Sequence, residues 1–416
     1  MTMAALGFAS GLPYALTNTT LQQWFVDAGV DIATIGLFTL VGLPYVLKVL
    51  WAPVLDRYTL PLLGRRRGWL IVLQLALVGA MMCLALVDPA GRLGPVAIVA
   101  IAVAFLSASQ DIVADAYRAD VLPTNERGPG AAMFVAGYRI AMLLTGAIVL
   151  ILVDQDYLSW SAVYALAAGA MIVGIVGTLT APEPTNPGQA PESLTQAVVA
   201  PLVDFLSRPG GSLVLLFVLL FRLPDTTANV ITGPFLREAG FTKSDIAIWR
   251  QFVGGVVTIA AALVGGGIIS RIGNLRSLWV FGVLQAASNL GFWWLATQEE
   301  PTRVHLVPVL IIESICGGLV TAGFFVFLMN QCRAEYSATQ YALLTSLMAT
   351  AGLAIGSFTG HLVQMIGFSQ FFLLTVALGL PGLFLLPAVG RSADAKPVGE
   401  LARGFPVVQP DDKLHS

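Results

Sequence analysis

The chain has 416 residues, of which 56% are hydrophobic and only 11% are charged. A soluble globular domain carries about 25% charged residues, so a surface this poor in charge must largely face lipid. The net charge of −2 argues against a nucleic-acid partner, because phosphate binding requires clustered Lys and Arg side chains.

Twelve apolar stretches are long enough to cross a membrane, because a spanning helix needs about 20 mostly apolar residues. They cover residues 3–26, 32–54, 69–88, 95–117, 128–153, 160–181, 212–236, 246–269, 276–297, 304–330, 338–362 and 367–388. The pattern predicts an all-α membrane protein with twelve transmembrane helices. Six belong to an N-terminal half, residues 1–181, and six to a C-terminal half, residues 212–390.

Two polar segments interrupt or follow these stretches. The first, residues 182–211, is rich in Pro and is predicted to be a cytoplasmic linker, with a short interfacial helix from Pro201 to Phe205. The second, residues 391–416, contains no span and is predicted to be a disordered cytoplasmic tail. Most Lys and Arg residues outside the spans fall on the side of the N-terminus, so the positive-inside rule predicts that both termini are cytoplasmic.

The two halves carry similar patterns at equivalent places. Arg118-Ala-Asp120 follows the fourth predicted span, and Arg333-Ala-Glu335 follows the tenth. A parallel duplication of six helices resembles the major facilitator superfamily. The loop from Asp56 to Arg67 also resembles a signature of that superfamily with wider spacing; the alternative is an ordinary positive-inside loop. The residues expected to form gate or loop salt bridges are Asp56, Arg57, Arg118, Asp120 and Arg333.

Charged residues within the predicted spans are the most informative, because each costs about 2.5–3.5 kcal/mol at the centre of a bilayer. On the fourth span, Asp111, Asp115 and Arg118 share one helix face because they are spaced by four and three residues. The whole set comprises the acids Asp111, Asp115, Asp225 and Glu313 and the bases Lys48, Arg139 and Arg222.

This set leaves one carboxyl without a basic partner, and a carboxyl buried without a partner takes up a proton. A proton-coupled carrier requires such a group. Asp111 and Asp115 are the preferred candidates, because neighbouring acids on one helix face repel each other. The alternative is that all these charges form interhelical ion pairs that only stabilise the bundle.

Polar side chains in the spans are candidates for substrate contact, because amides bind the hydroxyl and amide groups of sugars and peptides without burying a charge. Each amide can equally form a hydrogen bond between helices. The predicted substrate-binding residues, charged and uncharged together, are Asn18, Gln22, Lys48, Gln110, Tyr138, Arg139, Arg222, Asp225, Gln285, Asn289 and Glu313.

The sequence contains no hydrolase, kinase or nucleotide-binding motif, so we expect neither an enzyme nor an ATP-driven pump. No His or Cys cluster has the spacing of metal ligands, and we expect no metal or cofactor. Cys83, Cys316 and Cys332 lie in or beside apolar runs and are interpreted as small packing residues.

Several longer strings occur in order along the chain. They are Gly7–Pro13, Tyr45–Pro53, Asp56–Tyr58, Gly64–Trp69, Ser107–Ala116, Ala181–Thr185, Gln196–Pro201 and Ser337–Gln340. Together they resemble the AmpG muropeptide permeases of Gram-negative bacteria, and the resemblance covers nearly the whole chain.

This resemblance implies a major facilitator superfamily carrier in the bacterial inner membrane that imports GlcNAc-1,6-anhydromuramyl peptides by proton symport. Such import serves peptidoglycan recycling, a pathway that controls β-lactamase induction in some species. In the family pattern, Asp111 and Asp115 stand at acidic positions of the fourth helix, and Lys48 stands at a basic position of the second. The implied partners are the muropeptide, protons and the lipid bilayer, and a monomer is expected.

Other functions remain open at this point. The same fold could carry another anionic metabolite such as a CoA ester, or could export drugs, although a drug exporter would favour a more apolar cavity. A membrane receptor that does not transport is a third interpretation. It is disfavoured by the excess buried acid, because a receptor needs no proton cycle.

Overall fold

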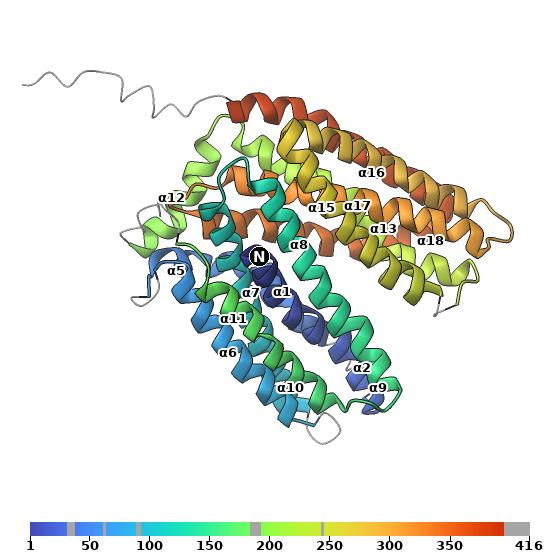
Figure 1. Ribbon diagram of the computed structural model, residues 1–416. Helices are drawn as coiled ribbons and strands as arrows, with labels where there is room; N and C mark the ends of the chain where they lie inside the picture. Colours follow the sequence, from blue (N-terminus) through green and yellow to red (C-terminus); the bar gives the residue numbers. More distant parts are fainter. Residues whose placement is uncertain (31–37, 61–63, 89–92, 184–192, 243–244, 395–416) are drawn as a thin grey trace, which may run out of the picture.

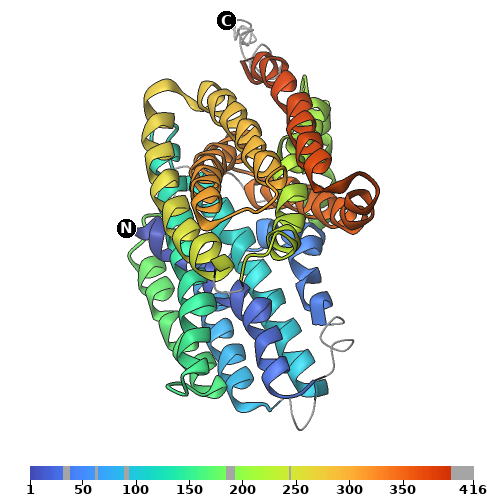
Figure 2. The ribbon, with the colours of Figure 1, turned by 90° about the vertical axis from the view of Figure 1, so that its right-hand side faces the viewer.

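The computed structural model describes residues 1–30, 38–60, 64–88, 93–183, 193–242 and 245–394. Within these ranges all regular secondary structure is helical. Two groups of helices lie side by side, one coloured blue to green and the other yellow to red (Figures 1 and 2). The prediction of an all-α protein built from two halves is confirmed.

The first group contains the helices before the linker. Its helices are α1 (Thr2–Thr17), α2 (Thr19–Asp27), η1 (Phe38–Gly42), α4 (Leu43–Leu47), η2 (Lys48–Leu50), α5 (Ala52–Arg57), α6 (Arg67–Leu86), α7 (Leu93–Val121), α8 (Arg127–Met142), η3 (Leu143–Ile148), α9 (Val149–Asp154), α10 (Trp160–Ala170) and α11 (Ile172–Leu179).

The linker contributes one helix, and the second group follows it. These helices are α12 (Leu194–Ser207), α13 (Gly211–Glu238), η4 (Ile246–Val253), α15 (Gly254–Ile272), α16 (Asn274–Ala296), α17 (Arg303–Gln331) and α18 (Ser337–Asp394).

Eight helices in the described parts of the chain are long and apolar enough to cross a membrane. The other predicted spans are too short, too polar or incompletely described to meet this criterion of length and apolar composition. The first is interrupted at Asn18, between α1 and α2, and the second lies partly outside the described residues. The ninth corresponds to α16, which is helical over 23 residues but carries polar side chains such as Gln285 and Asn289. The described helices are consistent with the twelve predicted spans.

The last two predicted spans are joined in α18. Within this helix Gly367 adopts a non-helical conformation, with φ 79° and ψ 163°. A positive φ of this kind strains residues that have a Cβ atom, so Gly367 marks the boundary between the two spans. The helix continues to Asp394, beyond the start of the predicted polar tail at Arg391. The rest of that tail, residues 395–416, lies outside the described residues.

Close helix packing in the N-terminal half depends on glycine. A Cβ atom added to Gly7 would lie 2.0 Å from the carbonyl oxygen of Phe134, and one added to Gly137 would lie 2.0 Å from that of Ala4. Helices α1 and α8 therefore touch through their backbones. Apolar surface provides no driving force for association within lipid, so this van der Waals contact between small residues is a main source of stability.

The halves meet along α8 and α15 in the same way. A Cβ atom on Gly128 would lie 2.7 Å from the carbonyl oxygen of Gly266, and one on Gly266 would lie 2.8 Å from that of Gly128. These two glycines bring the halves into backbone contact near the start of α8. The crossing has no room for larger side chains in the conformation observed.

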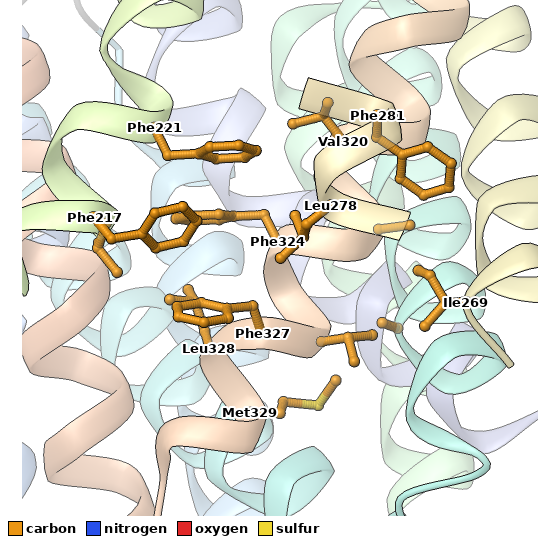
Figure 3. Packing of buried hydrophobic residues seen from close by; sticks show 14 of the residues in the cluster. Phe217, Phe221, Ile269, Leu278, Phe281, Val320, Phe324, Phe327, Leu328 and Met329 are labelled. Atoms are coloured by element: carbon orange, nitrogen blue, oxygen red, sulfur yellow. The ribbon is translucent and has the colours of Figure 1, made fainter. Parts of the chain in front are cut away.

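Aromatic side chains fill the core of the C-terminal half (Figure 3). Phe217 and Phe221 of α13 pack against Phe324 and Phe327 of α17, with ring centroids 4.8 Å apart for Phe217–Phe327 and 5.7 Å for Phe221–Phe324. All four are at most 7% exposed. Apolar side chains on the outside of the molecule are largely exposed, for example Leu86 at 80% and Phe384 at 78%. This surface requires an apolar solvent, as expected for helices in a bilayer.

The linker contains a longer helix than the sequence predicted. Instead of a short element from Pro201 to Phe205, α12 extends from Leu194 to Ser207, and the Ser193 hydroxyl accepts a hydrogen bond from Gln196 N at 3.1 Å. Residues 184–192 of the linker lie outside the described residues. The domain boundaries assigned from the sequence remain a prediction.

We predict that Gly137→Val destabilises the protein by about 1–3 kcal/mol, because overpacking at a backbone contact forces α1 and α8 apart. Thermal unfolding of the purified protein in detergent measures the effect. Gly169→Ala is the control, since no atom lies within 4 Å of an added Cβ at that position. Equal unfolding temperatures for the two variants would contradict the packing argument.

Candidate functional site

A cavity of about 530 Å³ lies between the two halves and is called the central cavity below. Its wall combines α1, α2, α8 and η3 with α13, η4, α15, α16 and α17. The polar lining residues are Gln23, Arg139, Arg222, Asp225, Asn229, Arg250, Gln251, Thr258, Gln285, Glu313, Ser314 and Thr321. The structure thus brings together Arg139, Arg222, Asp225, Gln285 and Glu313, which were predicted to bind substrate.

Three arginines and two carboxylates line the central cavity. Arg222 donates to Asp225 at 3.1 Å, three residues further along α13. Arg250 donates to the carbonyl oxygen of Asn229 at 3.2 Å. Among the described residues, neither Arg139, Arg250 nor Glu313 forms a direct ion pair. The lining therefore carries an excess of positive charge. It also offers both cationic and anionic groups to a bound solute.

Two π-helical segments line the cavity. They are η3 (Leu143–Ile148) and η4 (Ile246–Val253). Such segments shift the register of a helix and occur frequently at functional sites. Through η4 the chain presents Arg250 and Gln251 to the cavity. Arg250 was not among the predicted substrate-binding residues, although a charge early in an apolar stretch is a signal that could have identified it.

The other predicted substrate-binding residues lie outside the central cavity in this conformation. Asn18 separates α1 from α2 and donates to the carbonyl oxygen of Tyr14 at 3.0 Å. The Tyr138 ring lies 6.2 Å from the Tyr14 ring, measured between centroids. Asn289 is buried on α16, and Gln22 is half-buried on α2 beside Gln23, which does line the cavity.

A second group of charges lies within the N-terminal half. Lys48 Nζ is 3.9 Å from Asp115 Oδ2, and the Arg118 guanidinium donates to the other oxygen of Asp115. Asp111, one turn away on α7, makes no direct ion pair with the described residues. Its neighbour Gln110 is buried and donates to Ser10 Oγ at 3.4 Å. The two predicted proton carriers are therefore in different electrostatic surroundings.

The structure changes the charge balance inferred from the sequence. Arg118 and Arg250 join the buried or cavity-facing set, so bases outnumber acids overall. The charges also separate in space. Asp111 and Asp115 share the N-terminal half with Lys48 and Arg118, whereas Asp225 and Glu313 face the arginines of the central cavity. A total count could not reveal this division.

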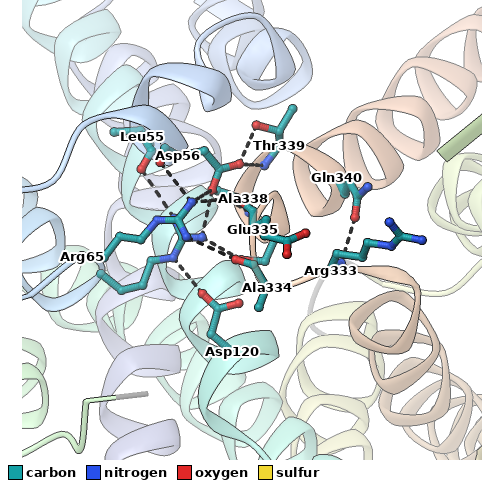
Figure 4. A network of polar contacts seen from close by, with 12 residues as sticks. Leu55, Asp56, Arg65, Asp120, Arg333, Ala334, Glu335, Ala338, Thr339 and Gln340 are labelled. Atoms are coloured by element: carbon teal, nitrogen blue, oxygen red, sulfur yellow. Dashed lines mark hydrogen bonds and ion pairs between the residues drawn. The ribbon is translucent and has the colours of Figure 1, made fainter. Parts of the chain in front are cut away.

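A buried polar network joins the halves at one end of the molecule (Figure 4). Asp56 Oδ2 accepts hydrogen bonds from Thr339 N at 2.7 Å and Thr339 Oγ1 at 2.6 Å. Thr339 lies in the first turn of α18, so Asp56 caps a helix of the opposite half. A carboxylate at a helix N-terminus satisfies backbone N–H groups and favours the helix dipole.

Two arginines complete this interhalf network. Arg65 donates to the carbonyl oxygen of Glu335 at 2.7 Å, and Arg66 donates to Ser337 Oγ at 2.7 Å and to Asp120 at 2.9 Å. Burial and the neighbouring Arg66 lower the pKa of Arg65 to about 10. For Arg66, the adjacent carboxylates Asp120 and Asp56 raise the pKa despite its burial. Both guanidinium groups therefore stay charged at neutral pH.

The predicted gate residues lie in four different surroundings. Asp56 and Asp120 belong to the interhalf network. Arg118 is buried on α7, donates to Tyr341 Oη of α18 at 3.1 Å, and lies 3.8 Å from the Phe134 ring centroid. Arg333 pairs instead with Asp204 of the linker and points away from Asp56 (Figure 4), while Arg57 lies over the Tyr58 ring. Arg65 and Arg66 were not predicted as gate residues, although the loop from Asp56 to Arg67 had been found to resemble a signature of the superfamily.

The comparison with known families agrees with this architecture. The sequence model described as Major Facilitator Superfamily matches residues 3–357. The chain belongs to the major facilitator superfamily.

Relatives within this superfamily refine the assignment. The anhydromuropeptide permease of Escherichia coli strain K12 is 45% identical over 385 residues, which is 92% of this chain and 77% of that protein. The resemblance to muropeptide permeases expected from the sequence strings is confirmed.

Solved structures agree on the fold at low sequence identity. The Escherichia coli fucose:proton symporter FucP superposes with a TM-score of 0.73 at 12% identity, covering 93% of this chain and 97% of that one. The proton:xylose symporter XylE superposes with a TM-score of 0.70 at 11% identity, covering 93% and 94%. Members of the superfamily with little sequence in common thus share this arrangement of helices.

We predict that Asp56→Ala opens the end of the molecule where α5 meets α18. Removing one partner of a buried ion pair costs about 3–5 kcal/mol. Here the closed conformation is destabilised, because the bonds from Asp56 to Thr339 form only when the halves meet. Spin labels are attached at positions 58 and 335, in place of Tyr58 and Glu335, in a variant whose native cysteines are replaced. Double electron–electron resonance then measures the distance between the two labels. Both positions are exposed.

Arg57→Ala is the matched control, because Arg57 lies on the same helix and makes no hydrogen bond or ion pair with the opposite half in the described part of the chain. The label distance should lengthen in the Asp56 variant and stay unchanged in the Arg57 variant. An unchanged distance in both would mean that the network does not close this end.

Proposed function

We propose that this chain is a proton symporter that imports GlcNAc-1,6-anhydromuramyl peptides across the bacterial inner membrane for peptidoglycan recycling. The observation that carries the proposal is the central cavity, whose three arginines and two carboxylates lie between the halves. The similarity to an anhydromuropeptide permease over 92% of this chain supports the choice of substrate.

The chemistry of the cavity suits a muropeptide. Such a molecule has sugar hydroxyls, several carboxylates and the ammonium groups of a stem peptide. Arg139, Arg222 and Arg250 are assigned to the carboxylates, because guanidinium groups bind carboxylates through two parallel hydrogen bonds. Glu313 is assigned to an ammonium group, since it has no direct cationic partner among the described residues. Gln285 Oε1 is buried without a described hydrogen-bond partner and can accept from a sugar hydroxyl.

Asp111 is our candidate for the proton carrier. Protonating Asp115 would leave Lys48 and Arg118 beside a neutral group, and uncompensated buried charges are costly. Protonating Asp111 breaks no direct ion pair in the described part of the chain. Lys48, which the resemblance places at a basic position, is assigned to this proton site because it contacts Asp115 and not the central cavity.

The interhalf network supports a proposal for the orientation of the protein in the membrane and for its transport cycle. The positive-inside rule places the interhalf network on the cytoplasmic side, with both termini cytoplasmic. With the network formed, the cytoplasmic end is closed, so a solute has to reach the central cavity from the periplasm. Import then requires the bonds from Asp56 to Thr339 to break, so that the halves separate at the cytoplasmic end.

The decisive experiment measures uptake of labelled GlcNAc-anhydroMurNAc-peptide into proteoliposomes, with and without an inward proton gradient. We expect gradient-driven accumulation by the wild type. For Asp111→Asn we expect accumulation to be lost while exchange of labelled for unlabelled substrate continues, because the exchange mode needs no net proton transfer.

The outcomes separate the two parts of the proposal. Accumulation by Asp111→Asn at the wild-type level would exclude Asp111 as the proton carrier. An active preparation that takes up no muropeptide, but exchanges another anionic metabolite such as a CoA ester, would exclude the substrate assignment.

We predict that Arg222→Gln raises the KM for the muropeptide about tenfold or more, because a hydrogen bond to a charged group contributes about 1.5–3 kcal/mol. The increase should be smaller for a substrate whose peptide carboxylates are amidated, since that substrate offers the arginine less charge. Initial uptake rates over a range of substrate concentrations measure both effects.

Glu238→Gln is the control for charge changes on α13, because Glu238 is exposed at the end of the helix and does not line the cavity. Equal sensitivity of Arg222→Gln to the amidated and free substrates would rule out direct contact between Arg222 and a carboxylate.

A further inference from the structure

A second cavity, of about 740 Å³, lies at the end of the molecule that the interhalf network closes. Its lining residues come from the α7–α8 connection, the end of α12, the start of α13, the α15–α16 connection and the end of α17. We call it the arginine cavity, because Arg127, Arg208, Arg276 and Arg333 line it. No carboxylate is among the residues lining it in the described part of the chain.

The positive charge of this cavity is only partly compensated. Asp204 contacts both Arg208 and Arg333. Arg127 is positioned by uncharged groups, donating to the carbonyl oxygen of Leu122 at 3.2 Å and to Asn330 Oδ1 at 2.6 Å. The acid Asp120, at the end of α7, pairs with Arg66 of the interhalf network. Among the described residues, two of the four guanidinium groups therefore pair directly with a carboxylate, and they share the same one.

Two of the arginines retain unused hydrogen-bond donors. Arg208 Nε is buried and has no hydrogen-bond partner among the described residues. Arg276 is exposed at the rim and makes no hydrogen bond or ion pair with any residue that the structure describes. A buried unpaired donor costs free energy, and converging guanidinium groups are the side chains best suited to bind a tetrahedral oxyanion.

We propose that the arginine cavity is a binding site for a phosphate group. Arg208 and Arg276 donate to the phosphate oxygens with unused N–H groups, and Arg127 supplies a fixed positive charge. The site is distinct from the central cavity, because Glu313 and Asn330 of α17 are 17 residues apart, or about 25 Å along a helix.

The surroundings indicate the sources of this phosphate. Helix α12 exposes Val199, Leu202, Val203 and Leu206, each between 39% and 57% accessible, and it ends next to Arg208. An exposed apolar face beside basic residues is typical of a helix lying at a membrane surface. A phospholipid could place its headgroup among the arginines and its acyl chains against α12. A soluble phosphate ester from the cytoplasm offers the same chemistry without the chains.

Binding at this site would stabilise the closed end. The lining residues come from the N-terminal half (Arg127), the linker (Arg208) and the C-terminal half (Arg276 and Arg333). A ligand that contacts all three segments binds the conformation in which they meet, and a ligand that prefers one conformation increases its population.

The test uses the purified full-length protein with four probes: dioleoylphosphatidylglycerol, dioleoylglycerol, glycerol 3-phosphate and inorganic phosphate. Native mass spectrometry and thermal unfolding measure binding over a range of probe concentrations. We expect saturable binding of at least one phosphate-bearing probe and none of dioleoylglycerol, which has the same chains without phosphate. Saturation by the phosphatidylglycerol alone identifies a lipid headgroup, whereas saturation by glycerol 3-phosphate or inorganic phosphate identifies a soluble ligand.

Variants at two arginines of one connection make the test specific. Arg276→Ala should weaken binding about tenfold or more, whereas Arg271→Ala should change it less than about twofold, because Arg271 is exposed nearby but does not line the cavity. Arg127→Gln, which keeps an amide donor for Asn330, provides a second cavity variant if Arg276→Ala fails to fold. Absence of saturable binding by any phosphate probe, or equal weakening by Arg271→Ala and the cavity variants, would overturn the proposal.

Discussion

A charge cannot remain unpaired in hydrocarbon at low cost, and this constraint organises the molecule. Charged side chains in the middle of the long helices turn inward. Arg222 pairs with Asp225 at the central cavity, whereas Asp115 pairs with Lys48 within the N-terminal half. The outward surface is left to exposed side chains such as Leu86 and Phe384. The need to remove charge from lipid thereby concentrates polar groups where a solute can bind them.

Two different kinds of contact join the halves. At the closed end, Asp56 caps α18 of the opposite half, and Arg65 and Arg66 bind the chain just before and at the start of that helix. These bonds are directional and few, so they can break together when the halves separate. At the same end, Gly128 at the start of α8 is in backbone contact with Gly266 of α15. This contact depends on the fit of two surfaces and not on hydrogen bonds. The polar network thus has the properties of a switch, whereas the glycine contact sets how closely the two halves pack.

The surroundings of Asp111 and Asp115 illustrate how neighbouring positions acquire different roles. Both lie on one face of α7, but Asp115 contacts Lys48 and Arg118, whereas Asp111 makes no direct ion pair with the described residues. Arg118 in turn donates to Tyr341 of α18. A change at this carboxylate pair therefore has a short physical route to the helix that the interhalf network holds, which is what coupling a proton to an opening motion requires.

The sequence by itself determined the class, the predicted spans, the duplicated halves and most of the charged residues of the central cavity. These features depend on apolar length, local charge and short motifs, all of which are read within one helix or loop. Only the tertiary structure decided which charges meet. Arg250 reaches the cavity through a π-helical turn, Arg118 turns inward to Asp115, and the arginine cavity combines segments far apart in sequence. Pairing depends on helix rotation and on contacts between halves, and neither is encoded in the spacing of residues along a single helix.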